Sequence, residues 1–93
     1  MPSVPTTGGN FAVTVTTTST TLNADENLKV RDSVVIKADA ANTDTIHVAV
    51  GQAATDANGF TLTAGQSVTI VNQLFNIFVK SDANSPTARV IWS

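Results

Sequence analysis

The chain of 93 residues has no cysteine and no tyrosine, and it contains one histidine and one tryptophan. Without cysteine, neither a disulfide framework nor a thiolate metal site can supplement the small core of a domain of this length. Only 13% of the residues are charged, against about 25% in ordinary soluble domains. We therefore expect protein to cover part of the surface, and self-association to supplement the core.

The charge distribution argues against two classes of partner. The net charge is -2, and the five cations are scattered along the chain: Lys29, Arg31, Lys37, Lys80 and Arg89. Binding to nucleic-acid phosphates calls for clustered cations, so we expect no nucleic-acid partner. No apolar run approaches the ~18 residues that span a bilayer, and residues 1–10 lack the basic start and apolar centre of a signal peptide. We expect a protein made in the cytoplasm, with no membrane contact and no export by the usual route.

Residues 59–70 carry the clearest structural signal in the chain. Phe60 and Leu62 alternate with threonines, a turn follows at Ala64-Gly65, and Val68 and Ile70 then resume the alternation. A period of two is typical of strands with one buried face. Similar segments, separated by turn-forming residues, predict strands at residues 11–22, 33–38, 45–50, 60–63, 67–71, 74–80 and 88–92. This spacing predicts an all-β fold, an antiparallel β-sandwich that is jelly-roll-like.

The domain organisation follows from the two ends of this pattern. Residues 1–10 contain two prolines and two glycines with little to bury, which predicts a short extended N-terminal arm, followed by a single sandwich domain at residues 11–93. We expect the arm, with Val4 and Pro5, to bind outside its own domain. Residues 11–22 are too long for one strand of so small a domain, and the parity of their apolar positions predicts a kink near residues 17–20.

Two predicted strands are apolar on both faces. In residues 34–36 and 74–79 apolar side chains fall on both faces of the strand, with Asn76 as the one polar residue, although one face of a strand in a small sandwich should meet water. A loop of the same chain or a neighbouring subunit would cover the second face, or these are merely scattered apolar residues on the surface, and the pattern leaves the alternatives open. The interface residues expected from the second alternative are Val35, Leu74, Phe75 and Phe78, together with Trp92, which is expected to be a core or interface anchor.

Candidate catalytic and metal-binding residues are few. His47 is expected to point away from the apolar face of its strand, toward solvent, and the chain offers no second histidine and no cysteine to act with it. Residues 39–44 contain carboxylate and amide oxygens suited to a hard cation, but the length and the glutamate of an EF-hand are missing, and such loop residues commonly bond their own backbone. Asp25 and Glu26 are adjacent in a turn. The sequence therefore predicts no enzyme, no catalytic residue, no cofactor and no metal ligand.

The order of these features resembles the small β-sandwich structural proteins of tailed bacteriophages, which include capsid decoration (cement) proteins and accessory modules of head fibres and tails. The residues that carry the resemblance are 27–31 (NLKVR), 33–38 (SVVIKA), 45–51 (TIHVAVG), 59–70 (GFTLTAGQSVTI), 76–80 (NIFVK) and 88–90 (ARV). It covers about residues 11–92 and supplies no catalytic residue.

This resemblance implies a virion protein, made in the host cytoplasm, that binds the outer capsid. Its implied partners are the major capsid protein and its own copies, in a homotrimer, and its implied role is to stabilise contacts between coat subunits. The alternative that it leaves is a head-fibre or tail accessory module that binds a host-surface carbohydrate. Sugar sites use exposed aromatic side chains, and a chain without tyrosine offers few.

Overall fold

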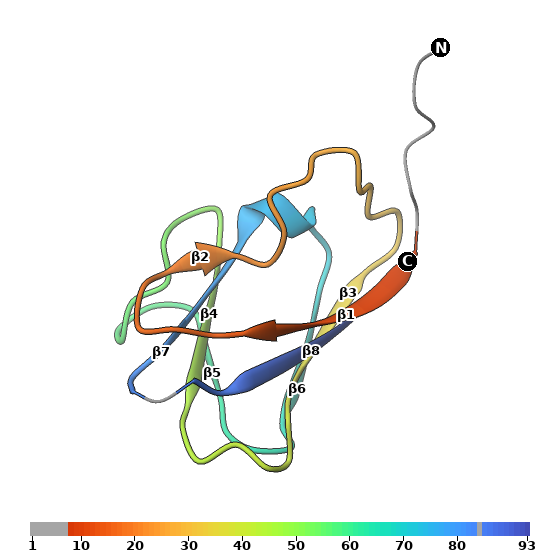
Figure 1. Ribbon diagram of the computed structural model, residues 1–93. Helices are drawn as coiled ribbons and strands as arrows, with labels where there is room; N and C mark the ends of the chain where they lie inside the picture. The colour runs from red at the N-terminus through yellow and green to blue at the C-terminus, as the bar shows by residue number, and fades with distance from the viewer. Residues whose placement is uncertain (1–7, 84) are drawn as a thin grey trace.

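The computed structural model describes residues 8–83 and 85–93, which form two packed antiparallel sheets (Figure 1). One sheet has the strand order β1-β8-β3-β6 and the other β2-β7-β4-β5. The strands are β1 (Gly9–Thr14), β2 (Thr20–Thr21), β3 (Val34–Ala38), β4 (Ile46–Val50), β5 (Phe60–Leu62), β6 (Ser67–Ile70), β7 (Ile77–Ser81) and β8 (Thr87–Trp92), and a 3₁₀ turn, η1 (Leu74–Asn76), precedes β7. No helix in these residues is long and apolar enough to cross a bilayer.

The strand pairing is that of a jelly roll. The first strand pairs with the last, β2 with β7, β3 with β6 and β4 with β5. The chain is thus one long hairpin of four strand pairs, wound so that alternate pairs fall in opposite sheets. The predicted fold class, an antiparallel and jelly-roll-like β-sandwich, is confirmed.

The kink expected in residues 11–22 is present. Strand β1 lies in one sheet and β2 in the other, and the chain crosses between them at residues 15–19. The crossing is held by the ends of β7 and β8, because the Val15 amide donates to the Pro86 carbonyl at 2.8 Å and the Ser81 amide donates to the Thr16 carbonyl at 2.8 Å. A strand that changes sheets in this way can bury apolar residues of opposite parity.

The core lies between the two sheets and consists of the residues of one parity from each strand. Its fully buried side chains include Val34, Ile36, Ile46, Val48, Ile77 and Val79. Residues of the other parity point outward, toward solvent or toward a loop. A partner of the folded domain would therefore meet the outward faces of the sheets rather than the core.

One expectation about the N-terminal end of the chain changes with the structure. Gly9 and Asn10, assigned to the arm, are paired residues of β1, opposite Trp92 and Ile91. The arm therefore ends at least two residues earlier than the pattern predicted. Gly9 lies close against the Trp92 ring, where an added Cβ would be 3.2 Å from Nε1. Val4 and Pro5, and with them the expected contacts of the arm, lie outside the described residues.

One expected interface residue, Leu74, belongs to the core instead, and Trp92, expected as a core or interface anchor, is a core residue. Leu74 is fully buried, because η1 rather than a strand carries it and turns it inward. Trp92 is 4% exposed, since its parity in β8 points it between the sheets. Neither can meet a partner of the folded domain. Val35, Phe75 and Phe78 are partly exposed.

Candidate functional site

Part of the outward face of the β2-β7-β4-β5 sheet, at β4, is covered by the chain itself. On β4, Ile46 and Val48 belong to the core, so His47 and Ala49 point outward, yet both are buried. The cover is the β4–β5 connection, residues 51–59, which we call the covering loop. It is anchored to residues 15–19, where the chain crosses between the sheets, because the Ala54 amide donates to Ser19 Oγ at 2.9 Å. On β4 the outward side chains are therefore buried by the chain itself, whereas Thr61 of β5, beside His47, is exposed and Phe78 of β7 is partly exposed.

His47 therefore has the predicted orientation but not the predicted exposure. It points away from the core as its parity requires, but only 6% of it is exposed. The difference arises because the covering loop folds back over β4. Turn-forming residues at 56–59 marked the end of this loop in the sequence, but not the direction in which it folds.

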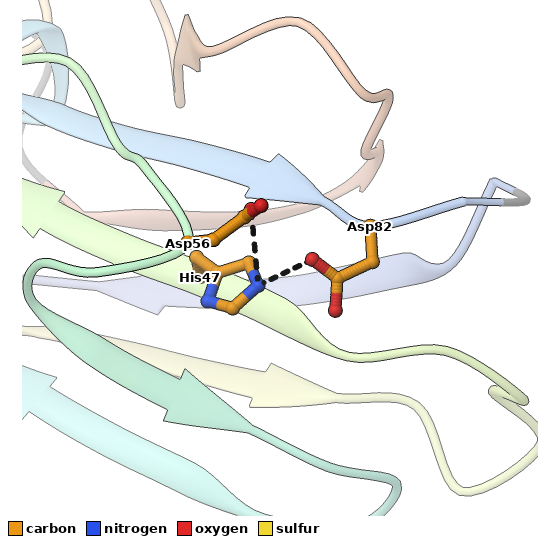
Figure 2. A group of neighbouring side chains, drawn as sticks. All are labelled: His47, Asp56 and Asp82. Atoms are coloured by element: carbon orange, nitrogen blue, oxygen red, sulfur yellow. Dashed lines mark hydrogen bonds and ion pairs between the residues drawn. The ribbon is translucent and has the colours of Figure 1, made fainter.

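Two carboxylates and an ammonium group surround the imidazole. His47 Nε2 lies 2.8 Å from Asp82 Oδ1 and 3.7 Å from Asp56 Oδ1, and Figure 2 shows both carboxylates directed toward this nitrogen. Lys80, the partner of His47 across the β4–β7 pair, places Nζ 2.5 Å from Asp56 Oδ1. We call these four residues the His47 cluster.

The fold brings the cluster together from three places. His47 lies in the middle of β4, Lys80 lies in β7, Asp82 follows β7 directly, and Asp56 belongs to the covering loop. Pairing between β4 and β7 thus brings together residues 35 positions apart in the chain. Strand pairing and the covering loop thus join Asp56 and Asp82, which are far apart in the sequence.

Hydrogen bonding and charge act together at Asp56. A hydrogen bond from Lys80, and then the charge of that ammonium, lower the pKa of the Asp56 carboxyl below its ordinary value.

The imidazole of His47 donates from Nε2 to Asp82 in its neutral form. Its other nitrogen, Nδ1, is buried and contacts no hydrogen-bond partner among residues 8–83 and 85–93. Neither ring nitrogen contacts a hydroxyl group that could act as a nucleophile in this part of the chain.

We predict that replacing Lys80 by methionine raises the pKa of Asp56 toward its ordinary value. Because the folded state binds this proton more weakly than the unfolded state, the contact stabilises the fold above the ordinary aspartate pKa, and this stabilisation is lost as the pH falls through the lowered value. A carboxyl-carbon NMR titration measures the pKa of Asp56 in the unaltered protein and in the variant. Lys37→Met, a change on the other sheet, is the control and should leave the midpoint unchanged. Equal midpoints in all three proteins would show that Lys80 does not hold the carboxylate.

In the loop at residues 39–44, the side chains of Asn42 and Asp44 bond backbone groups that lie outside the loop. Asn42 donates to the Thr87 carbonyl and accepts from the Thr87 amide, at 2.9 Å each. Asp44 accepts from the amides of Thr45 and Ala83. These contacts fasten the β3–β4 connection to β8, in line with a structural role for this loop.

A second surface feature lies at one open edge of the sandwich. A hollow of about 440 Å³ lies between the edge strands β5 and β6, and its lining comprises Phe60, Thr61, Leu62, Gln66, Ser67 and Val68. Phe60 is 60% exposed. The hollow thus combines an accessible aromatic ring with amide and hydroxyl groups.

No protein-family model, curated protein or solved structure matches the chain. Its function is therefore inferred from its own fold, its surfaces and the side chains that the fold gathers.

Proposed function

We propose that this protein is a structural protein of a bacteriophage virion, a capsid decoration (cement) protein that binds the outer capsid and stabilises contacts between coat subunits. The observation that carries the proposal is the outward face of the β1-β8-β3-β6 sheet, which we call the open face. Among the described residues no loop covers it as the covering loop covers β4 of the other sheet. The jelly-roll topology is common among viral capsid proteins and agrees with this class.

The open face has an apolar centre beside a basic row. Strand register places Asn10, Ile91, Val35 and Thr69 in one row across the four strands, and Ala12, Arg89, Lys37 and Ser67 in the next. Ile91 is 64% exposed. An exposed apolar patch with a polar surround is typical of a protein-binding surface. We assign the open face to the major capsid protein.

The protein acts at the capsid surface by multivalent contact rather than by catalysis. A small interface on each subunit, joined to two others in a homotrimer, binds far more tightly than a single copy. Because the protein binds only assembled shells, it stabilises them by mass action, by about 2.7 kcal/mol per site at a hundredfold excess over Kd. The low charge content supports such self-association.

Decorated particles are expected to release their genome at a higher temperature than particles stripped of this protein. Val35→Ser and Ile91→Ser should each weaken attachment about tenfold or more, because each removes an apolar contact from the centre of the open face. The matched control is Val71→Ser, which changes an exposed valine beyond the end of β6. Equal release temperatures for decorated and stripped particles would contradict the cement role.

A head-fibre or tail accessory module that binds a host-surface carbohydrate is the second candidate, favoured by the hollow at Phe60. Sugar-binding sites stack the apolar face of a ring on an exposed aromatic and bind hydroxyl groups with polar side chains, and Thr61, Gln66 and Ser67 lie beside Phe60. If this candidate holds, Phe60→Ala abolishes binding to host-cell glycans and leaves capsid attachment unchanged. Lack of glycan binding by the unaltered protein would exclude it.

A further inference from the structure

Three potential metal ligands converge in the His47 cluster. His47 Nε2, Asp56 and Asp82 each offer one ligand atom, and these atoms lie within 4.8 Å of one another. We propose that His47, Asp56 and Asp82 bind one divalent transition-metal ion, with zinc as the reference ion. This site is separate from the open face and goes beyond the proposed virion function.

The distances suit a small four-coordinate ion. Zinc binds nitrogen and oxygen ligands at about 2.0–2.2 Å in tetrahedral geometry, which puts neighbouring ligand atoms about 3.3 Å apart. The distances from His47 Nε2 to the two aspartate oxygens, 2.8 and 3.7 Å, lie on either side of this value. Small side-chain rotations of the exposed aspartates would bring both oxygens to the required separation.

The scaffold holds the histidine firmly and leaves the aspartates accessible. His47 is buried on β4, which pairs with β5 on one side and β7 on the other. The Asp56 and Asp82 side chains reach solvent, so an ion has a path to Nε2 and a free position for water. A buried imidazole with two accessible carboxylates matches the three protein ligands plus water of open zinc sites.

The three ligand groups, one imidazole and two carboxylates, favour a transition-metal ion over calcium. Imidazole nitrogen favours zinc and other first-row transition ions, whereas calcium takes six to eight oxygen ligands. One nitrogen and two carboxylates fall far short of a calcium site. The inference therefore commits to a transition-metal ion.

Lys80 occupies the cluster when no metal is bound. Its ammonium contacts Asp56 and donates to the Ser81 carbonyl at 3.3 Å, so it neutralises one of the two carboxylates. An incoming ion displaces the ammonium from Asp56, and the Ser81 carbonyl remains as its partner. Lys80 is thus a competitor of the metal, and its charge lowers the affinity of the site.

Binding of a metal ion requires the proton on Nε2 of His47 to leave that nitrogen. His47 donates from Nε2 to Asp82 in the metal-free protein, and a metal-bound Nε2 carries no proton. The ring proton then lies on Nδ1, which is buried among residues 8–83 and 85–93 without a partner. This nitrogen is unpartnered in both tautomers, so the change adds no new unsatisfied atom.

The experiment measures zinc binding by the purified, untagged chain, by competition with a chromophoric chelator and by thermal unfolding. We expect one zinc ion per chain and a rise in Tm of about 10–20 °C at a hundredfold excess of zinc over Kd. Asp56→Asn and Asp82→Asn should each weaken zinc binding about tenfold or more. Lys80→Met should tighten zinc binding, because it removes the ammonium that competes with the ion for Asp56. A merely structural role of the Lys80–Asp56 ion pair would not produce this gain. Calcium should not raise Tm.

The matched control is Asp25→Asn, which removes one exposed carboxylate in the β2–β3 connection. It should bind zinc as the unaltered protein does. Equal weakening by Asp25→Asn and Asp56→Asn, or no zinc-dependent rise in Tm of either the unaltered protein or Lys80→Met, would overturn the site. Those results leave capsid attachment untouched, since the open face lies on the other sheet, so failure of the metal site is distinguishable from failure of the cement role.

Discussion

Replacing Trp92 by alanine is expected to destabilise the domain by about 3–5 kcal/mol, a large part of the ~5–15 kcal/mol typical of small domains. Trp92 is 4% exposed and pairs with Gly9 on β1 and with Val34 on β3. Its ring fills the space left by the missing side chain of Gly9, where an added Cβ would lie 3.2 Å from Nε1. Alanine would leave a cavity between two strands that the same ring now joins.

The neighbouring residue provides the control for this prediction. Ile91 belongs to the same strand but points to the open face, so Ile91→Ser should change the free energy of unfolding by less than about 1 kcal/mol. Urea unfolding followed by circular dichroism measures both. The two variants should separate stability from attachment, since Trp92→Ala acts on the first and Ile91→Ser on the second. Similar unfolding free energies would contradict the assignment of Trp92 to the core.

Much of the fold could be predicted because apolar and polar residues alternate along a strand that has one face in the core and the other in solvent. The pattern at residues 59–70 located β5, the turn and β6 within a residue or two. Parity also predicted the kink in residues 11–22, since a straight strand would have exposed the apolar residues on one side of it. These inferences needed only local information.

The candidate site could not be predicted in the same way because its parts meet through tertiary structure. His47 is buried by the covering loop, and Asp82 reaches it through the pairing of β4 with β7. Neither contact leaves a local pattern in the sequence. Leu74 was misassigned for a related reason, because an apolar run can reflect a short turn packed into the core as well as a strand with two covered faces.

Gly59→Ala is expected to destabilise the domain by more than about 3 kcal/mol, through backbone strain and steric overlap. Gly59 has a φ of +70°, a conformation that residues with a Cβ rarely adopt, and an added Cβ would overlap the carbonyl oxygen of Val48 on the neighbouring strand. A backbone carbonyl within a sheet cannot rotate away as a flexible side chain can. The end of the covering loop would therefore have to move, and β5 with it.

Gly65→Ala separates the two causes. Gly65 has a φ of +82°, but an added Cβ meets nothing within 4 Å, so only the cost of the left-handed conformation, about 1–2 kcal/mol, is expected.

The larger loss in Gly59→Ala should be accompanied by release of Asp56, three positions earlier in the covering loop. The pKa of its carboxyl should then return to its ordinary value, because the contact with Lys80 is broken. Equal unfolding free energies for the two variants, measured in urea, would mean that the loop adapts at Val48. A lowered Asp56 pKa in Gly59→Ala would mean that the His47 cluster, rather than the glycine, positions the covering loop.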